Sequence, residues 1–102
     1  MMLEFDIAWA VVGAQDPLRW MEKYASRINA VHIKDLAPQG ECTDEDGWAD
    51  VGHGTMDWNT LMKSVQDTRT RHYVMEHDNP NDHVRFATRS IATVKSLSLI
   101  HI

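Results

Sequence analysis

The feature that most constrains the fold is a nearly continuous apolar run, Ile28–Ile33, which carries His32 near its end and is followed directly by Lys34 and Asp35. Such a run is typical of a parallel strand that is buried on both faces. Parallel strands need long crossover connections, which are usually helices. The run therefore predicts an α/β arrangement with polar side chains at the carboxyl end of a strand.

Two other segments share this design. Residues 2–7 form an apolar run with Asp6 near its end, and residues 72–76 form one that ends on Glu76. Both predict short strands. Each of the three expected strands thus delivers a metal-binding or acid/base side chain to its carboxyl end.

Helical patterns separate and follow these strands. Asp16 and Pro17 predict an N-cap and the first position of a helix that runs to about Ser26. Asp57 is the next expected N-cap, and the break at residues 79–82 precedes a third helix. Helical spacing predicts buried faces of Trp58, Leu61, Met62 and Val65 in the second helix and of Val84, Ala87, Ile91 and Val94 in the third. Trp20, Trp58 and Phe86 are predicted core residues.

Two connections carry no clear helical or strand pattern. Residues 8–15 are expected to be a connection with a turn at Gly13. Residues 36–56 form a long polar segment that is either functional or flexible. The acidic group within it, from Glu41 to Asp50, is expected to be solvated.

The expected order βαβαβα implies parallel strands joined by right-handed crossovers. Three such units cannot close a barrel, because a (β/α)8 barrel needs about 250 residues. We therefore expect residues 1–96 to be the last three βα units of a TIM barrel, encoded by a longer gene. Residues 97–102 match the translation of a transposon-end adapter used in sequencing libraries, and are predicted to be non-native. The alternative is a native apolar end of the last helix.

Composition limits the class of function. The formal net charge of −5 argues against nucleic-acid binding, which needs a concentrated basic surface. The single cysteine, Cys42, excludes an internal disulfide and fits a reducing compartment. No apolar run reaches the roughly 18 residues of a membrane span, and no signal sequence opens the chain. We therefore expect a cytoplasmic protein with no membrane partner.

Asp6, His32 and Glu76 are the candidate metal ligands. Active sites of α/β barrels and sheets lie at the carboxyl ends of the strands, where all three are expected. Two carboxylates with one imidazole suit Mn²⁺, our first choice, or Mg²⁺, Co²⁺, Fe²⁺ or Zn²⁺. Each residue also has a structural alternative: a helix cap or salt bridge for the carboxylates, and a hydrogen-bonded core position for His32.

Neighbouring residues are candidate substrate contacts. Lys34 shares a face with His32 and could hold a hydroxyl, carboxylate or phosphate, or could pair with Asp35 at the surface. Asp78 could be a substrate carboxylate or a turn residue. Trp9 could form an apolar wall for a sugar ring or pack at the rim. His53 is expected to be exposed.

The order of motifs resembles the sugar phosphate isomerase/epimerases, which are TIM barrels of the xylose isomerase type. The resemblance covers roughly residues 2–96 and lies in six segments: Leu3–Trp9, Gly13–Pro17, Arg27, Val31–Asp35, Val51–Trp58 and Val74–Pro80. It implies a divalent metal with four ligands, of which Asp6, His32 and Glu76 match three. The fourth, a glutamate from an earlier strand, would lie outside this chain.

The resemblance also implies a mechanism and a substrate class. The residue matching Glu76 exchanges a proton with the substrate carbon, while the metal polarises the carbonyl and stabilises an enediolate. The position of Lys34 often contacts substrate. Trp9 stands where some relatives have a histidine, which argues against a second metal and the DNA-repair endonuclease branch.

We therefore expect an isomerase or epimerase acting on a small sugar or polyol ketone. The alternatives are a dehydratase on the same scaffold, with Lys34 and Asp35 assisting loss of a hydroxyl, and a metal-dependent phosphodiesterase, which the acidic charge disfavours. The isolated chain is expected to be inactive, and a homo-oligomeric parent is left open.

Overall fold

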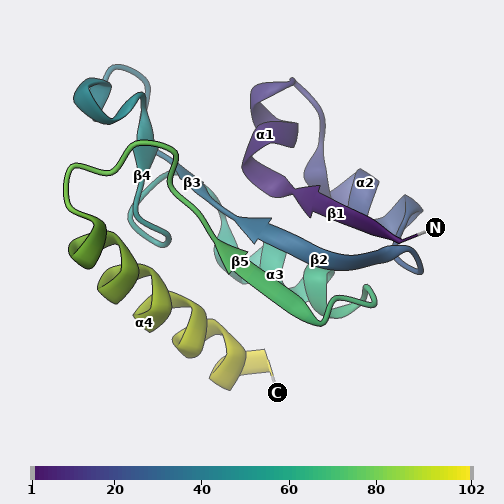
Figure 1. Cartoon of the computed structure of the whole chain (residues 1–102). Coiled ribbons are helices and arrows are strands. Elements are labelled where there is room, and N and C mark those ends of the chain that lie inside the picture. Colours follow the sequence, from purple (N-terminus) through teal and green to yellow (C-terminus); the bar gives the residue numbers. More distant parts are fainter. Residues whose placement is uncertain (1, 102) are drawn as a thin grey trace. The chain divides into compact units, whose positions relative to one another are not determined.

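The computed structural model describes the backbone of residues 2–101 and the side chains of residues 2–97 (Figure 1). The chain forms two compact units, Met1–Ile33 with Asp57–Val74, and Lys34–Met56 with Met75–Ile102. The strands are β1 (Leu3–Asp6), β2 (Ile28–Ile33), β3 (Asp35–Leu36), β4 (Trp48–Ala49) and β5 (His72–Met75). The helices are α1 (Ile7–Val12), α2 (Pro17–Lys23), α3 (Trp58–Gln66), α4 (His83–His101) and the 3-10 turn η1 (Thr43–Glu45).

A sheet in the order β1-β2-β5 is the centre of the first unit. β1 and β2 pair in parallel, with Phe5 opposite Val31 and Asp6 opposite His32. Since side chains alternate along a strand, Asp6 and His32 lie next to each other on one face. The predicted α/β fold with a parallel sheet is confirmed, and β2 has the bounds expected from its apolar run.

The prediction that residues 8–15 form a connection is wrong, because residues Ile7–Val12 form α1. The helix starts where the Asp6 carboxylate accepts the Trp9 backbone N–H at 3.0 Å. It ends at Gly13, whose N–H donates to the carbonyl of Trp9. The sequence pattern does not reveal this helix, because it is short and contains two adjacent β-branched residues, Val11 and Val12.

The capping predictions for α2 and α3 are confirmed. Asp16 accepts the Leu18 N–H with Pro17 as the first helical residue, and Asp57 accepts the Thr60 N–H. α2 ends at Lys23, before the expected Ser26. The four apolar residues predicted for α3 are all buried, and α2 and α3 pack together behind the sheet in Figure 1.

Trp20 is not a core residue. Its side chain is 38% exposed and stacks on Tyr24 with the ring centroids 5.3 Å apart. The Lys23 ammonium lies over both rings, so one face of α2 is an exposed aromatic and cationic surface. The core of the first unit is formed instead by Ile7, Ala8, Met21, Ile28, Ala30, Val31, Ile33, Trp58, Leu61, Met62 and Val65.

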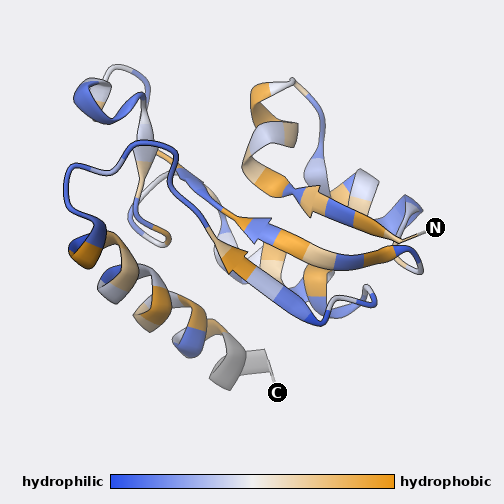
Figure 2. Cartoon of the chain, in the orientation of Figure 1, coloured by the Kyte–Doolittle hydropathy of each residue, from blue (hydrophilic) through white to orange (hydrophobic). Residues whose placement is uncertain are grey.

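In the second unit, the segment expected to be a long polar loop, residues 36–56, forms regular structure instead. β3 and β4 form an antiparallel hairpin in which Leu36 pairs with Trp48. η1 lies in the connection between them, which is mostly hydrophilic (Figure 2). Both strands have only two residues, too few for a periodic signal, so pattern analysis finds only the polar connection.

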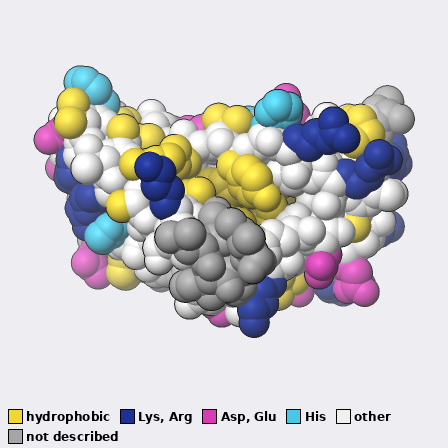
Figure 3. All heavy atoms as spheres, turned by 90° about the horizontal axis from the view of Figure 1, so that it is seen from below, with side chains coloured by type: hydrophobic (Ala, Val, Ile, Leu, Met, Phe, Trp, Pro, Cys, Tyr) yellow, Lys and Arg dark blue, Asp and Glu magenta, His cyan; other side chains and the backbone are white. Residues whose placement is uncertain are grey.

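The buried face predicted for α4 is wrong. Val84 is 62% exposed and Ile91 39%, whereas Ser90 and Leu97 are buried. The orientation of the helix follows polar contacts, since the Ser90 hydroxyl accepts the buried Val51 N–H at 3.0 Å. In the space-filling view, hydrophobic side chains lie open among charged ones on the visible face (Figure 3).

The predicted non-native tail, residues 97–102, is largely outside the described side chains. Leu97 is buried on α4, while the side chains from 98 onward are not described. The origin of the tail thus stays a prediction. No described helix is both long enough and apolar enough to cross a lipid bilayer.

Candidate metal and acid/base site

Asp6 uses its two carboxylate oxygens in different directions. Oδ1 caps α1 by accepting the Trp9 N–H at 3.0 Å, and Oδ2 lies 3.7 Å from Nδ1 of His32. The side chain is 20% exposed. Asp6 therefore caps a helix, which was the expected structural alternative, and also lies beside His32, as expected for a metal ligand.

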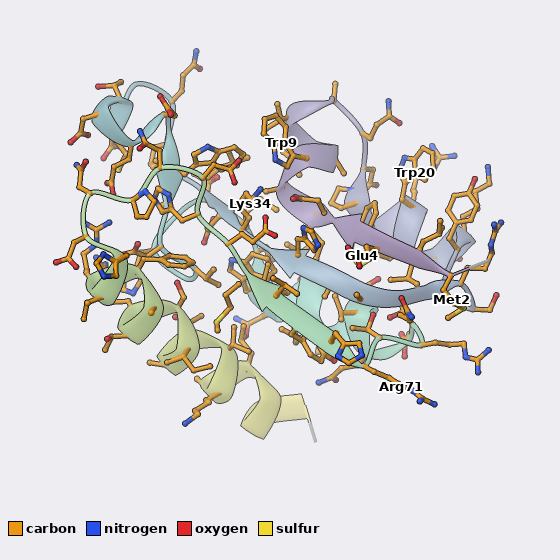
Figure 4. All side chains as sticks on the ribbon, viewed as in Figure 1. Met2, Glu4, Trp9, Trp20, Lys34 and Arg71 are labelled. Carbon is orange, nitrogen blue, oxygen red and sulfur yellow. The ribbon has the colours of Figure 1, made fainter. Side chains whose placement is uncertain are left out.

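His32 lies between two carboxylates of β1. Its Nε2 is 3.3 Å from Oε2 of Glu4, which is on the exposed edge strand (Figure 4), and its Nδ1 faces Asp6. A hydrogen bond from Nε2–H to Glu4 leaves the lone pair on Nδ1, on the side of Asp6. Carboxylates commonly orient metal-binding histidines in this way.

Glu76 is the residue directly after β5, at the carboxyl end of the third strand of the sheet. Its side chain is 31% exposed and belongs to the second unit, where Oε2 lies 3.2 Å from Nζ of Lys34. Asp78 lies beside the same ammonium at 3.1 Å and is 41% exposed. Glu76 and Asp78 thus share one cation.

The alternative expected for Lys34 was an ion pair with Asp35 at the surface. It does not fit the structure, because the Lys34 side chain is only 2% exposed. Its ammonium lies 5.0 Å from the centroid of the Trp48 ring, as well as next to Glu76 and Asp78. A buried ammonium is costly unless it is paired. The acidic residues and the ring provide this pairing.

Asp35 is fully buried and holds the chain around it. Its carboxylate accepts the backbone N–H groups of Gly52, Gly54, Met56 and its neighbour Leu36, at 2.9 to 3.3 Å. A carboxylate bound in this way cannot also face a substrate without releasing these hydrogen bonds. Asp35 therefore has a structural role, and its expected contact with substrate stays a prediction.

Trp9 is 49% exposed on α1 (Figure 4). It lines a hollow of about 610 Å³ with Phe5, Tyr24 and other residues along β1, all in the first unit. The apolar wall expected at Trp9 is therefore present, and its contact with a sugar ring stays a prediction. His53 is exposed, as expected.

A second group of charged residues was not predicted from the sequence. Glu45 and Asp50, expected to be solvated, are buried and pair with Arg85 and Arg89 of α4. Near them, the His77 side chain is fully buried, with its Nε2 3.7 Å from Glu45. Burial lowers the pKa of His77, against the opposing effect of the carboxylates. Only the dense acidic group from Glu41 to Asp50 hinted at these charges.

No protein-family model and no curated protein matches the chain. Two crystal structures of sugar phosphate isomerase/epimerases from Parabacteroides distasonis do match. One is 28% identical over 90% of this chain with a TM-score of 0.67, and the other is 27% identical over 91% with a TM-score of 0.62. The resemblance to the sugar phosphate isomerase/epimerases is confirmed. The chain spans 29% and 30% of the lengths of these two proteins, and so corresponds to part of a barrel.

The likeness to these two structures agrees with the general class of isomerase or epimerase expected from the sequence. The residues at the strand ends fit a divalent cation by their chemistry, since carboxylates and a neutral imidazole are the ligands that such ions take. Asp6 and His32 are already neighbours on adjacent strands, and both are partly exposed.

Proposed function

We propose that this chain forms part of a divalent-metal-dependent sugar phosphate isomerase/epimerase. Asp6, His32 and Glu76 would bind the metal, for which Mn²⁺ is the first candidate. The observation that carries the proposal is the pairing of Asp6 with His32 at the ends of adjacent parallel strands, in a chain with the fold of this family. Glu76 occupies the corresponding end of the next strand.

When bound, the metal would polarise the substrate carbonyl and stabilise the enediolate that follows loss of a proton. Glu76 would move that proton at the carbon next to the carbonyl. Glu4 would keep Nδ1 of His32 turned toward Asp6, and Asp6 would at the same time fix the start of α1. The substrate would be a small ketose, sugar phosphate or polyol ketone, with no role for nucleic acid or a membrane, in the cytoplasm.

The dehydratase alternative loses support at Asp35. That alternative used Lys34 and Asp35 to help a hydroxyl leave, but both side chains are buried and Asp35 accepts four backbone N–H groups. Proton exchange without loss of water is therefore the better proposal.

The test is solvent deuterium exchange into a panel of ketoses and ketose phosphates. It uses the full-length protein that contains this chain, stripped of metal and then supplied with Mn²⁺. We expect exchange at the carbon next to the carbonyl only with metal, and its loss in Glu76→Gln. Glu41→Gln, at an exposed position of the hairpin connection, is the matched control. Full exchange in Glu76→Gln would contradict the proposal, and the isolated chain is expected to show none.

A further inference from the structure

Lys34 is among the most buried large side chains of the described chain. Removing an ammonium from water is expensive, and the loss is offset only by well-placed partners. Here the partners lie on three sides: Glu76 at 3.2 Å, Asp78 at 3.1 Å and the Trp48 ring at 5.0 Å. All four residues belong to the second unit.

The hairpin builds this arrangement. Lys34 directly precedes β3, and Trp48 lies on β4, paired with Leu36 of β3. The next residue, Asp35, fixes the start of β3 through its hydrogen bonds to Gly52 and Gly54. The backbone of Lys34 is therefore fixed by the hydrogen bonds of the next residue, and its ammonium lies against the Trp48 ring. The ammonium has little freedom to move.

We infer that Lys34 is a positioning residue, which fixes the orientation of the Glu76 carboxylate, and that it is not a direct substrate contact. The inference rests on the proposed function, in which Glu76 is a ligand and the acid/base group. A carboxylate with rotatable bonds must be held to act at one place, and a fixed ammonium 3.2 Å away does this. Asp78 completes the pairing of the same cation.

Electrostatics and positioning predict opposite effects on metal affinity. A positive charge beside a cation site weakens binding, so removal of a bystander lysine would strengthen it. Loss of a group that orients a ligand typically weakens metal affinity by about 10- to 100-fold. The sign of the change therefore separates the two roles.

The experiment is Mn²⁺ titration of the full-length protein that contains this chain by calorimetry, with circular dichroism to check the fold. We expect Lys34→Met to weaken Mn²⁺ binding about tenfold or more, Lys34→Arg to fall between Lys34→Met and the wild type, and Lys95→Met, an exposed control on α4, to leave it unchanged. Binding by Lys34→Met that equals or exceeds that of the wild type would overturn the inference. If Lys34→Met does not fold, Lys34→Gln takes its place.

A double-mutant cycle without metal keeps the inference separate from the proposed function. It compares the urea unfolding midpoints of Lys34→Met, Glu76→Gln and the double variant. Because Lys34 and Glu76 pair directly, we expect the two effects to be non-additive, with the double variant no less stable than Lys34→Met. Additive effects would overturn the inference. A full-length protein that binds no Mn²⁺, together with this coupling, would refute the metal site and leave the role of Lys34 in place.

Discussion

The guanidinium of Arg85 on α4 donates to the carboxylate of Glu45 at 2.6 Å, across 40 residues of sequence. The same guanidinium donates to Asp50 at 2.8 Å, and Asn81 donates its backbone N–H to Glu45 at 2.8 Å. Arg89, one helical turn later, pairs with Asp50 at 3.1 Å. These contacts explain why α4 turns a polar side toward the hairpin connection while Val84 and Ile91 stay exposed.

The ion pair between Glu45 and Arg85 predicts that the fold loses stability in acid. The Asn81 N–H and then Arg85 hold the pKa of Glu45 below its usual value of 4.5. A lowered folded-state pKa means that the ionised form stabilises the fold above pH 4.5, and that this contribution disappears as the pH falls through the folded-state pKa. Glu45→Gln should lower the free energy of unfolding by about 1–3 kcal/mol at pH 7 and by much less in acid.

Urea unfolding at pH 7 and at several lower pH values would measure this difference. Glu41→Gln, at an exposed position of the same connection, is the control and should match the wild type at each pH. An equal deficit for Glu45→Gln at every pH would show that the loss comes from packing and not from the charge.

Asp35 is predicted to hold the segment from Gly52 to Met56 in place. Asp35→Asn keeps the shape but replaces one acceptor oxygen with an NH2 group, which cannot accept the backbone N–H groups. We expect a loss of about 2–3 kcal/mol in the free energy of unfolding, because buried donors are left without partners. Hydrogen exchange should also show faster exchange at the amides of Gly52, Gly54 and Met56.

Asp46→Asn is the control, since Asp46 is exposed with φ 57°, a conformation that asparagine tolerates. Unchanged protection of those three amides in Asp35→Asn would refute this role.

The sequence predicts the three longer strands and the starts of α2 and α3 well, because these depend on local patterns. The apolar run of β2, the caps at Asp16 and Asp57, and the buried face of α3 all follow from spacing within one element. The hairpin and α4 depend on distant partners instead. The orientation of α4 follows from Glu45, Asp50 and Val51, which no helical periodicity can reveal.

The site shows the same division. That Asp6 and His32 are neighbours could be predicted, because their places at the ends of adjacent parallel strands fix it. The environments of Lys34 and Asp35 could not, since they depend on Trp48 and the glycines that the hairpin brings near. A helix cap also does not exclude the proposed ligand role, because one oxygen of Asp6 caps α1 while the other lies beside His32.

The cap formed by Asp6 and its proposed role as a metal ligand can be separated by substitution. Asp6→Asn can still cap α1 through its amide oxygen but loses the charge beside His32, whereas Asp6→Ala loses both. Asp6→Asn should therefore keep the thermal unfolding midpoint close to that of the wild type while weakening Mn²⁺ binding in calorimetry by tenfold or more, on the order of a lost ligand charge. Asp6→Ala should lower both. Equal Mn²⁺ affinity in wild type and Asp6→Asn would remove Asp6 from the proposed ligands.

Gly52 and Gly40 form a matched pair for the contact between the hairpin connection and α4. Both have positive φ, 89° and 86°, so alanine is strained at either position by about 1–2 kcal/mol. A Cβ at Gly52 would lie 2.9 Å from Cβ of Thr93 on α4, whereas one at Gly40 would meet nothing within 4 Å. Gly52→Ala should thus cost about 1–3 kcal/mol more than Gly40→Ala in urea unfolding. Thr93→Ala should recover part of that excess in the Gly52→Ala background, because it removes the two side-chain atoms that would lie closest. Equal losses for the two glycine variants would mean that α4 moves away from Gly52 at little cost.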